Sequence, residues 1–333
     1  MNLQRASVVL IIALLTTALL IGTSRGSGLP EKWRTTLGRD HPLTGQIWDV
    51  TAARFIDPSA LVARLTQSRF ALLGEKHDNP DHHRLQARLL SALVAGGRRP
   101  AVGFEMLNVD QQAAIDRYLH DAPTDASGLA DAVHWHRSGW PDWSLYEPIA
   151  EIALKARLPI FAANLPSSTV EALGREGLGG MDPALVTRLG LDRPLAPKTH
   201  AAMATEIRDS HCGYASDAMI ESMIAVQRAR DAQMAERLVA AGRGVGAVLI
   251  AGVGHIRTDW GMPATMAILL PGSTVTSVAF LEVEARERTA DAYASQFGDG
   301  PLPFHFVWFT PRVDDVDPCE KFGKQLKKLE KRN

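Results

Sequence analysis

The chain has 333 residues, which is enough for one large domain or two modest ones. Hydrophobic residues make up 46% of it and charged residues 22%, as is ordinary for a globular protein with a sizeable core. The formal net charge is -1, so there is no basic excess of the kind that binds nucleic acid, and no nucleic-acid partner is expected.

A long apolar run follows the first basic residue. Arg5 precedes ASVVLIIALLTTALLIGT at residues 6–23, and the small residues SRGSG follow. This pattern is typical of a secretory signal peptide, predicted here over residues 1–27. The run is also long enough to act as an uncleaved membrane anchor. No Cys lies near it, which excludes lipid attachment there. In both readings the folded part is exported, either periplasmic or membrane-anchored and facing outside the cytoplasm.

Residues 28–47 are rich in Pro, Gly and charge and are predicted to be an entry linker, followed by one domain over residues 48–312. That domain should begin with a short helix, DPSALVARLTQ, capped by Asp57 and with Pro58 in its first turn. Short apolar runs then alternate with stretches of helical spacing. The runs are RFALLGE (69–75), PAVGFEM (100–106), LPIFAAN (158–164), GAVLIAGVG (246–254), STVTSVAFLEV (273–283) and FHFVWFT (304–310). Alternating apolar strands and helices predict an α/β fold, with a mostly parallel sheet flanked by helices on both faces.

Two segments are longer than a crossover helix needs. Residues 108–143 and 166–242 are predicted to be helical insertions that form a smaller cap subdomain over one edge of the sheet. Residues 313–333 are predicted to be a basic tail. The chain has two Cys, Cys212 and Cys319. An exported protein could pair them, but Cys319 lies in a tail expected to be mobile, so no essential disulfide is predicted.

Polar residues stand where the predicted strands end. The first run ends at Glu75 and leads to His77, the second ends near Glu105, the third ends at Asn164, and the fourth leads to His255 and Arg257. Ligands of an open parallel sheet bind beyond the carboxyl ends of its strands. We therefore expect Glu75, His77, Glu105 and His255 to form one cluster, with Asn164 and Arg257 in support.

This cluster has more than one possible chemistry. Two imidazoles and two carboxylates suit a divalent metal with an open coordination position, and they equally suit general acid–base catalysis. The alternative is a hydrogen-bonded network that only orders the loops. Asn79, His82 and His83 follow the first strand at the start of a helix for which Asp81 is the expected N-cap. The same helix face can point back toward the strand ends, so Asn79, His82 and His83 are further supporting candidates.

A second constellation lies in the larger insertion. RDSHCGYASDAM at residues 208–219 places His211 and Tyr214 beside a helix-breaking Gly, in a segment rich in Met. Tyr and His are both known axial ligands of haem iron, and a Met-rich apolar surface suits a flat ligand. Trp135, Trp140, Trp143 and Tyr146 could wall such a pocket, although packing of a cap against the sheet would also explain them.

These motifs together resemble a known family. GEKHDNPDHHRLQ (74–86), GFEM (103–106), SGWPDWSLYEPI (138–149), ANLP (163–166), HCGYASDAM (211–219) and GVGHIRTDWGMP (252–263) look like the haem-binding uptake family, the ChaN-like group of the Tiki and erythromycin-esterase superfamily. The likeness runs from about Trp48 to Leu281. It implies an α/β core with a helical cap in an exported, usually membrane-attached protein of haem or iron acquisition. It further implies haem held between two protomers, with a Tyr as iron ligand.

Two hypotheses follow. The first is an exported haem-binding protein of haem or iron uptake, with haem as cofactor, Tyr214 and His211 as ligand candidates and a homodimer around the haem. The second is a hydrolase, metal-dependent or acid–base, that uses Glu75, His77, Glu105 and His255, as the superfamily resemblance also implies. Haem binding is the prediction adopted, with the strand-end cluster as a catalytic or divalent-metal site beside it.

Overall fold

The structure, a computed structural model, describes residues 32–298, 300–321 and 323. The predicted signal peptide or anchor over residues 1–27 lies outside the described residues, as does most of the basic tail. Among the helices of the described ranges, none combines the length and the apolarity needed to cross a membrane.

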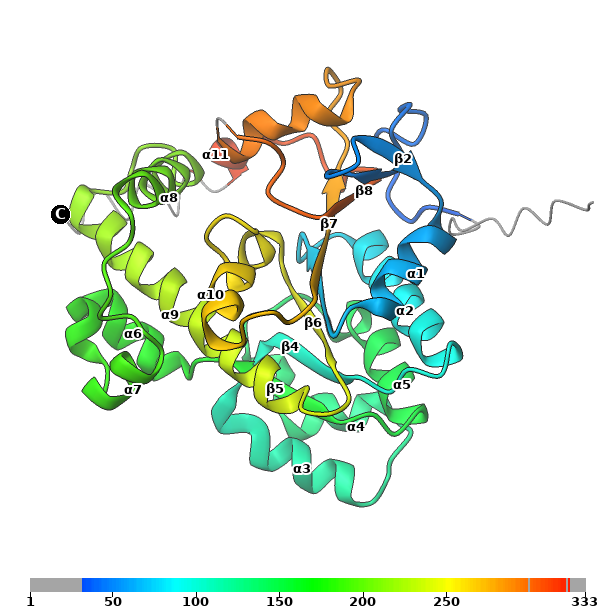
Figure 1. The fold of residues 1–333 in the computed structure, drawn as a ribbon, viewed down its shortest axis with the longest axis horizontal. Coiled ribbons are helices and arrows are strands. Elements are labelled where there is room, and N and C mark those ends of the chain that lie inside the picture. Colours follow the sequence, from blue (N-terminus) through cyan, green and yellow to red (C-terminus); the bar gives the residue numbers. More distant parts are fainter. Residues whose placement is uncertain (1–31, 299, 322, 324–333) are drawn as a thin grey trace, which may run out of the picture.

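Within the described residues, an eight-stranded sheet lies at the centre of the molecule, in the order β2-β1-β8-β7-β3-β6-β4-β5 (Figure 1). Its strands are β1 (Ile47–Asp49), β2 (Arg54–Ile56), β3 (Phe70–Glu75), β4 (Ala101–Asn108), β5 (Ile160–Asn164), β6 (Ala247–Gly252), β7 (Val275–Glu282) and β8 (Phe306–Thr310). Strands β3 to β8 pair in parallel, whereas β1 is antiparallel to both β8 and β2. The predicted α/β fold with a mostly parallel sheet is confirmed. The β1–β2 hairpin escaped prediction, because three-residue strands show too little alternation.

The longer segments between the strands are helical. The α-helices of the described chain are α1 (Pro58–Gln67), α2 (Pro80–Ala95), α3 (Gln112–His120), α4 (Ala126–Ala132), α5 (Glu147–Lys155), α6 (Ser167–Glu176), α7 (Pro183–Arg188), α8 (Pro197–Ser210), α9 (Asp217–Ala241), α10 (Met262–Leu269) and α11 (Pro318–Lys321). Short 3-10 helices are η1 (Val109–Gln111), η2 (Trp135–Arg137), η3 (Trp143–Leu145), η4 (Gly177–Gly180), η5 (Val253–Ile256) and η6 (Ala290–Phe297).

Hydrophobic cores cover both faces of the sheet, as predicted. Successive side chains of a strand point to opposite faces, so Leu73 belongs to the core shared with α1, α2 and α5. Its neighbour Leu72 belongs to the core shared with α9 and α10. Burial on both faces explains why the strands are apolar throughout instead of alternating with polar residues.

The two insertions pack against different parts of the molecule. In the second, α6 to α9 carry small cores of their own, such as the one built around Met203, Ile220 and Ile224, and they form the predicted cap. In the first, Ile115 and Leu129 pack into the main core with α2 and α5. The expectation that both insertions contribute to the cap is therefore wrong for residues 108–143, whose apolar side chains are needed to cover the sheet.

Two predicted helix caps differ from the structure. Helix α2 is capped by Asn79, whose side chain accepts hydrogen bonds from the backbone N–H groups of Asp81 and His82. Asp81, the expected cap, instead accepts hydrogen bonds from the backbone N–H groups of Arg34 and Thr35. Part of the predicted entry linker is thereby fixed to the domain. Asp57 does stand at the N-cap of α1, but its side chain makes no capping hydrogen bond.

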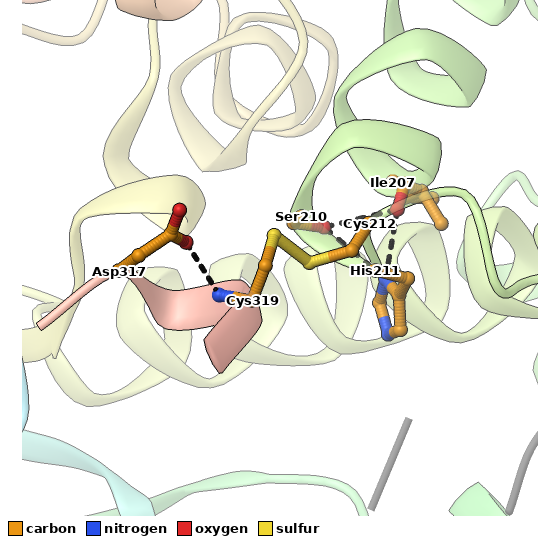
Figure 2. The surroundings of a disulfide bond; sticks show 6 residues. All are labelled: Ile207, Ser210, His211, Cys212, Asp317 and Cys319. Atoms are coloured by element: carbon orange, nitrogen blue, oxygen red, sulfur yellow. Dashed lines mark hydrogen bonds between the residues drawn. A yellow bond between two sulfur atoms is a disulfide. The ribbon is translucent and has the colours of Figure 1, made fainter. Parts of the chain in front are cut away.

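The tail differs from its prediction because it is joined to the domain by a disulfide. Cys319, in α11, forms a disulfide with Cys212, which follows α8 (Figure 2). The two Cys lie 107 residues apart in the sequence. The prediction of no essential disulfide assumed a mobile tail. Instead, α11 lies beside α8 (Figure 1), which brings the two thiols within bonding reach.

Candidate functional site

Four adjacent strands, β3, β6, β4 and β5, deliver polar side chains to one edge of the sheet. Glu75 ends β3, Asn164 ends β5, and His255 lies in η5 directly after β6. Glu105 lies inside β4, where the pairing with β5 shifts register, and an irregularity of this kind re-aims side chains. All four side chains are buried. The side chains thus lie at one edge of the sheet, as the strand-end rule predicts, although the exact end of β4 differs from the expectation.

Glu75 is the centre of a buried hydrogen-bond network. Its Oε1 accepts a hydrogen bond from the Tyr146 hydroxyl at 3.1 Å and lies 2.9 Å from Nδ1 of His77. Its Oε2 lies 2.7 Å from Nδ1 of His83. Burial by itself would raise the pKa of Glu75, but the neighbouring His83 and His77 outweigh it and lower that pKa to about 2. Glu75 is thus a carboxylate at neutral pH.

His77 presents its other ring nitrogen to a cavity. Because Nδ1 is bound to Glu75, Nε2 is left directed at Gly252, where an added Cβ would lie only 2.9 Å from it. Burial opposes protonation of His77, but the hydrogen bond to Glu75 and the charge of Glu105 raise its pKa overall. The ring of Trp140 packs edge-on against the imidazole, with centroids 4.9 Å apart.

Glu105 and His255 form a second group of contacts. Glu105 accepts hydrogen bonds from Arg230 and from the backbone N–H of Gly252. His255 has Nε2 3.3 Å from Glu105 and Nδ1 2.6 Å from Asp231. Burial would lower the pKa of His255, but Glu105 and Asp231 raise it to about 9, so the ring is an imidazolium at neutral pH.

The predicted cluster of four therefore consists of two contact groups, one around Glu75 and one around Glu105. They approach each other at Gly252, next to which both His77 and Glu105 lie. We call Glu75, His77, Glu105, Arg230 and His255 the polar floor.

The polar floor closes one end of a cavity of about 690 Å³. Apolar side chains from α8 and α9 form much of the wall. They are Met203, Ile207, Met219, Met223 and Val226. The lining residues of α9 run from Met219 to Arg230, a length of about 16 Å at 1.5 Å per residue. A cavity of this size with one apolar and one polar end suits a flat, amphipathic small molecule.

The two constellations predicted separately thus meet in one cavity. His211 lines the same cavity as the polar floor. Its Nδ1 lies 2.8 Å from the carbonyl oxygen of Ile207, which can only accept, so Nδ1 carries the proton. The other ring nitrogen points away from this contact (Figure 2). Tyr214, three residues later, is partly buried and does not line the cavity.

Among the four aromatic residues expected to wall the pocket, Trp140 lines the cavity and the other three do not. Trp135 packs against Trp143 and Tyr146 in the main core. Packing, the alternative considered above, therefore explains Trp135 and Trp143, whereas Tyr146 also donates its hydroxyl hydrogen bond to Glu75.

Arg257 supports the cavity wall from behind. Its fully buried guanidinium pairs with Glu206 at 2.7 Å and with Asp259, and it lies 3.5 Å from the ring centroid of Trp260. Glu206 and Trp260 both line the cavity. Arg257 thus holds two wall residues without itself facing the cavity.

The other predicted supporting residues have structural contacts. His82 accepts a hydrogen bond from the Lys76 backbone N–H through Nδ1 and contacts Thr310 through Nε2, and burial keeps its pKa well below the usual value. Asn164 donates a hydrogen bond to the backbone carbonyl of Glu105. His83 adjoins Glu75, while Asn79 caps α2.

A divalent-metal site at Glu75, His77, Glu105 and His255 is not supported. Among the residues that the structure describes, no three His, Cys, Asp or Glu side chains are arranged to hold a metal ion. The physical reason is that the carboxylates already have partners, Arg230 and a backbone N–H for Glu105 and imidazoles for Glu75.

Sequence reasoning missed the contribution of α9 to the site. Gln227, Arg230 and Asp231 all contact polar groups at the floor. Their spacing of i, i+3 and i+4 puts them on one helix face. A polar stripe in an otherwise apolar, Met-rich helix was the signal that could have identified them.

Comparisons with known proteins agree with this architecture. The model of the family described as "Haem-binding uptake, Tiki superfamily, ChaN" matches residues 61–266. A solved structure described as cofacial heme binding to ChaN of Campylobacter jejuni is similar with a TM-score of 0.62 and 20% identity, covering 79% of this chain and 95% of that one. At this identity the likeness shows the fold.

Weaker similarities also occur. A mutant of erythromycin esterase EreC in its open conformation has a TM-score of 0.41 at 16% identity, covering 90% of this chain and 88% of that one. The type III effector HopBA1 has a TM-score of 0.40 at 15% identity, covering 75% of this chain and 91% of that one. No curated protein matches the chain in sequence.

Proposed function

We propose, from the premise that this chain belongs to the haem-binding uptake family of the Tiki superfamily, that it binds haem in the cavity between α8, α9 and the polar floor. The observation that carries the proposal is His211, which lines the cavity with its Nδ1 proton bound to a backbone carbonyl. Imidazoles that ligate metals commonly have their second nitrogen fixed in this way, which leaves Nε2 as the ligand.

The rest of the cavity fits a porphyrin. The thioethers of Met203, Met219 and Met223 offer a soft, apolar surface, and Trp140 and Trp260 add aromatic walls. The polar floor at the other end provides hydrogen-bonding groups suited to the polar edge of such a ligand. Haem is the cargo of the protein in this proposal, and the residues of the chain bind and orient it.

Tyr214 remains the second ligand candidate. It lies on residues 211–216, which we call the cap loop, together with His211. The family resemblance favours a Tyr ligand, whereas the cavity lining favours His211. We propose His211 as the principal iron ligand and Tyr214 as an alternative at the same loop.

The test is the visible spectrum of the purified protein titrated with haemin. A bound complex should give a shifted Soret band, and His211→Ala should change that band or lower the affinity. Tyr214→Phe tests the alternative ligand. His200→Ala is the matched control, since His200 lies on the adjoining helix α8 but pairs with Glu221 on the exposed surface. A spectrum unchanged by both His211→Ala and Tyr214→Phe would remove the cap loop from the haem site.

We further propose that two protomers associate around haem, as the family resemblance implies. Sedimentation velocity with and without haemin tests this, because the dimer should appear on haem addition. A protein that stays monomeric when saturated with haemin would contradict it.

We propose that residues 1–27 direct export of the protein for this uptake role. The folded domain would then be periplasmic or anchored to the membrane. Fractionation of cells that express the full chain tests it. Full-length protein recovered from the cytoplasm would contradict export, and processed protein in the periplasm would distinguish a cleaved signal from an anchor.

A second candidate function is acid–base hydrolysis at the polar floor. The specific observation is the Glu75–His77 contact, in which a buried carboxylate orients an imidazole whose Nε2 faces the cavity. Such a pair is suited to a general base. Turnover of activated esters that is abolished in His77→Ala would support this function, and no turnover above the His77→Ala background would dismiss it.

A further inference from the structure

The cap loop carries both proposed haem ligands and, between them, one half of a disulfide. Cys212 directly follows His211 and precedes Tyr214 by two residues, and it is bonded to Cys319 of α11 (Figure 2). We propose that this disulfide is a redox-controlled latch, which holds the cap loop in its haem-binding position and whose reduction weakens haem retention. The proposal rests on the proposed haem site at this loop.

Apart from the disulfide, the cap loop is held at its far end, where Ala215 is buried in the small core around Met203 and Ile220, and Ser216 caps α9. The backbone N–H groups of residues 211–214 all bond back to residues 207–211, so they close the end of α8. An ion pair between Arg208 and Asp217 spans the loop, but both side chains are largely exposed, and such pairs contribute little.

The backbone of the loop is also in an unusual conformation. Cys212 has a φ of 55° and Gly213 a φ of 75°, the left-handed region that a non-glycine residue seldom occupies. A covalent bond at Cys212 therefore acts on the residue whose conformation sets the direction of the loop.

The other half of the latch lies in residues 314–321, which we call the C-terminal strap. Lys321 of the strap pairs with Asp314 at 2.6 Å and lies 3.8 Å from Asp78, the residue after His77. The strap thus reaches from the neighbour of one cavity residue, His77, to the neighbour of another, His211. Its contact with Asp78 is a weak, half-exposed ion pair, whereas its contact with the cap loop is covalent.

The disulfide is accessible to a reductant, because Cys319 is exposed and Cys212 partly so. A thiolate of a dithiol reductant would attack Sγ of Cys319, and Cys212 would leave as a thiolate that takes up a proton. The second thiol of the reductant then displaces Cys319. In sum two electrons and two protons pass to the protein, which gains two thiols, while the reductant becomes a disulfide. Exposed disulfides are the ones that exchange in this manner, and an oxidising compartment keeps the latch closed.

Loss of the latch should appear as loss of haem affinity without loss of the fold. A loop that holds its ligand correctly for only about a tenth of the time lowers the apparent affinity about tenfold. The two main cores lie on the faces of the sheet and include no residue of the cap loop or of the C-terminal strap.

The experiment measures haem release from the purified full-length protein to an excess of apomyoglobin. The samples are the oxidised wild type, the wild type treated with dithiothreitol, Cys319→Ser, and the Cys212→Ser/Cys319→Ser double variant. We expect about tenfold faster release from the last three, with unchanged far-ultraviolet circular dichroism. Dithiothreitol should have no further effect on the double variant, which controls for direct action on the iron.

Release at the oxidised wild-type rate from the reduced protein and both variants would overturn the latch. If His211→Ala or Tyr214→Phe alters the haem spectrum in the same series, the haem site stands and the latch alone is wrong. If the oxidised wild type binds no haemin at all, both the proposed function and the latch fail. Chemical reduction of the wild type keeps the test decisive should a serine variant not fold.

Discussion

Nδ1 of His255 lies 2.6 Å from Oδ1 of Asp231, and both residues are buried. His255 follows strand β6, whereas Asp231 lies in the middle of α9, so this contact joins the sheet edge to the long helix of the cap. The Asp231 carboxylate fixes the ring and favours its charged form. The same imidazolium faces Glu105 at 3.3 Å, so the ring bridges two carboxylates at the polar floor.

This bridge predicts strong coupling between Asp231 and His255. The Asp231→Asn and His255→Ala variants should each lose stability, because each leaves a buried polar partner uncompensated, at a cost of about 3–5 kcal/mol. The double variant should lose less than the sum of the two single losses, and the shortfall, the coupling energy, should be about 1–3 kcal/mol. Urea unfolding of the wild type, the two single variants and the double variant measures it.

A second cycle, of Glu75→Gln with His255→Ala, is the control. It should be additive within about 0.5 kcal/mol, since these residues belong to different contact groups. Equal coupling in both cycles would contradict the division into two groups.

The charge of His255 predicts a pH dependence of stability. Its pKa is raised from 6.5 to about 9 in the folded protein, so its contribution is fully present below about pH 6.5 and is lost as the pH rises through 9. The full contribution is about 3 kcal/mol. The difference in unfolding free energy between the wild type and His255→Gln, measured by urea unfolding from pH 6 to pH 9.5, should therefore shrink as the pH rises. A difference that stays constant over this range would show that the ring is not charged in the folded state.

Replacing Arg257 should lower the stability of the protein, because this residue supports the cavity wall. Arg257→Ala should cost about 2–4 kcal/mol, because it removes a fully buried side chain and its pairs with Glu206 and Asp259. Arg188→Ala is the matched control, since its pair with Glu236 is on the surface and should contribute less than about 1 kcal/mol. Thermal melting distinguishes the two. Equal melting temperatures for the two variants would mean that Arg257 does not support the wall.

The N-cap residues of α2 and α1 should differ in how much they contribute to stability. Asn79→Ala should cost about 2 kcal/mol, since Asn79 caps α2 and also donates hydrogen bonds to Glu282 and to the carbonyl of Pro311. Asp57→Ala should stay within about 0.5 kcal/mol, because the Asp57 side chain makes no capping hydrogen bond. Chemical denaturation measures both. A large loss in Asp57→Ala would show that N-cap chemistry follows the residue type and not the contacts seen here.

Much of the fold was visible in the sequence because its signals are local. The strands β3 to β8 are short apolar runs bounded by Gly, Pro or polar residues, and the helices between them show a period of 3.6 residues. Glu75, Asn164 and His255 stand directly at or after strand ends, so the rule for parallel sheets predicts from the sequence that they lie at one edge.

The partners of those residues were decided only by the tertiary structure. Tyr146 is 71 residues from Glu75 in the sequence, and Asp231 meets His255 across the boundary between the cap and the sheet. No local pattern encodes such pairs, because they depend on how α9 and α5 pack onto the sheet.

The same distinction explains the disulfide and the cavity. The sequence alone established that Cys212 and Cys319 exist and that His211 lies in a Met-rich helical insertion. It could not establish that the tail lies beside α8, or that the insertion and the strand ends enclose one cavity. Contacts between segments a hundred residues apart arise from the burial of several helix faces at once, and that collective packing is a property of the folded chain.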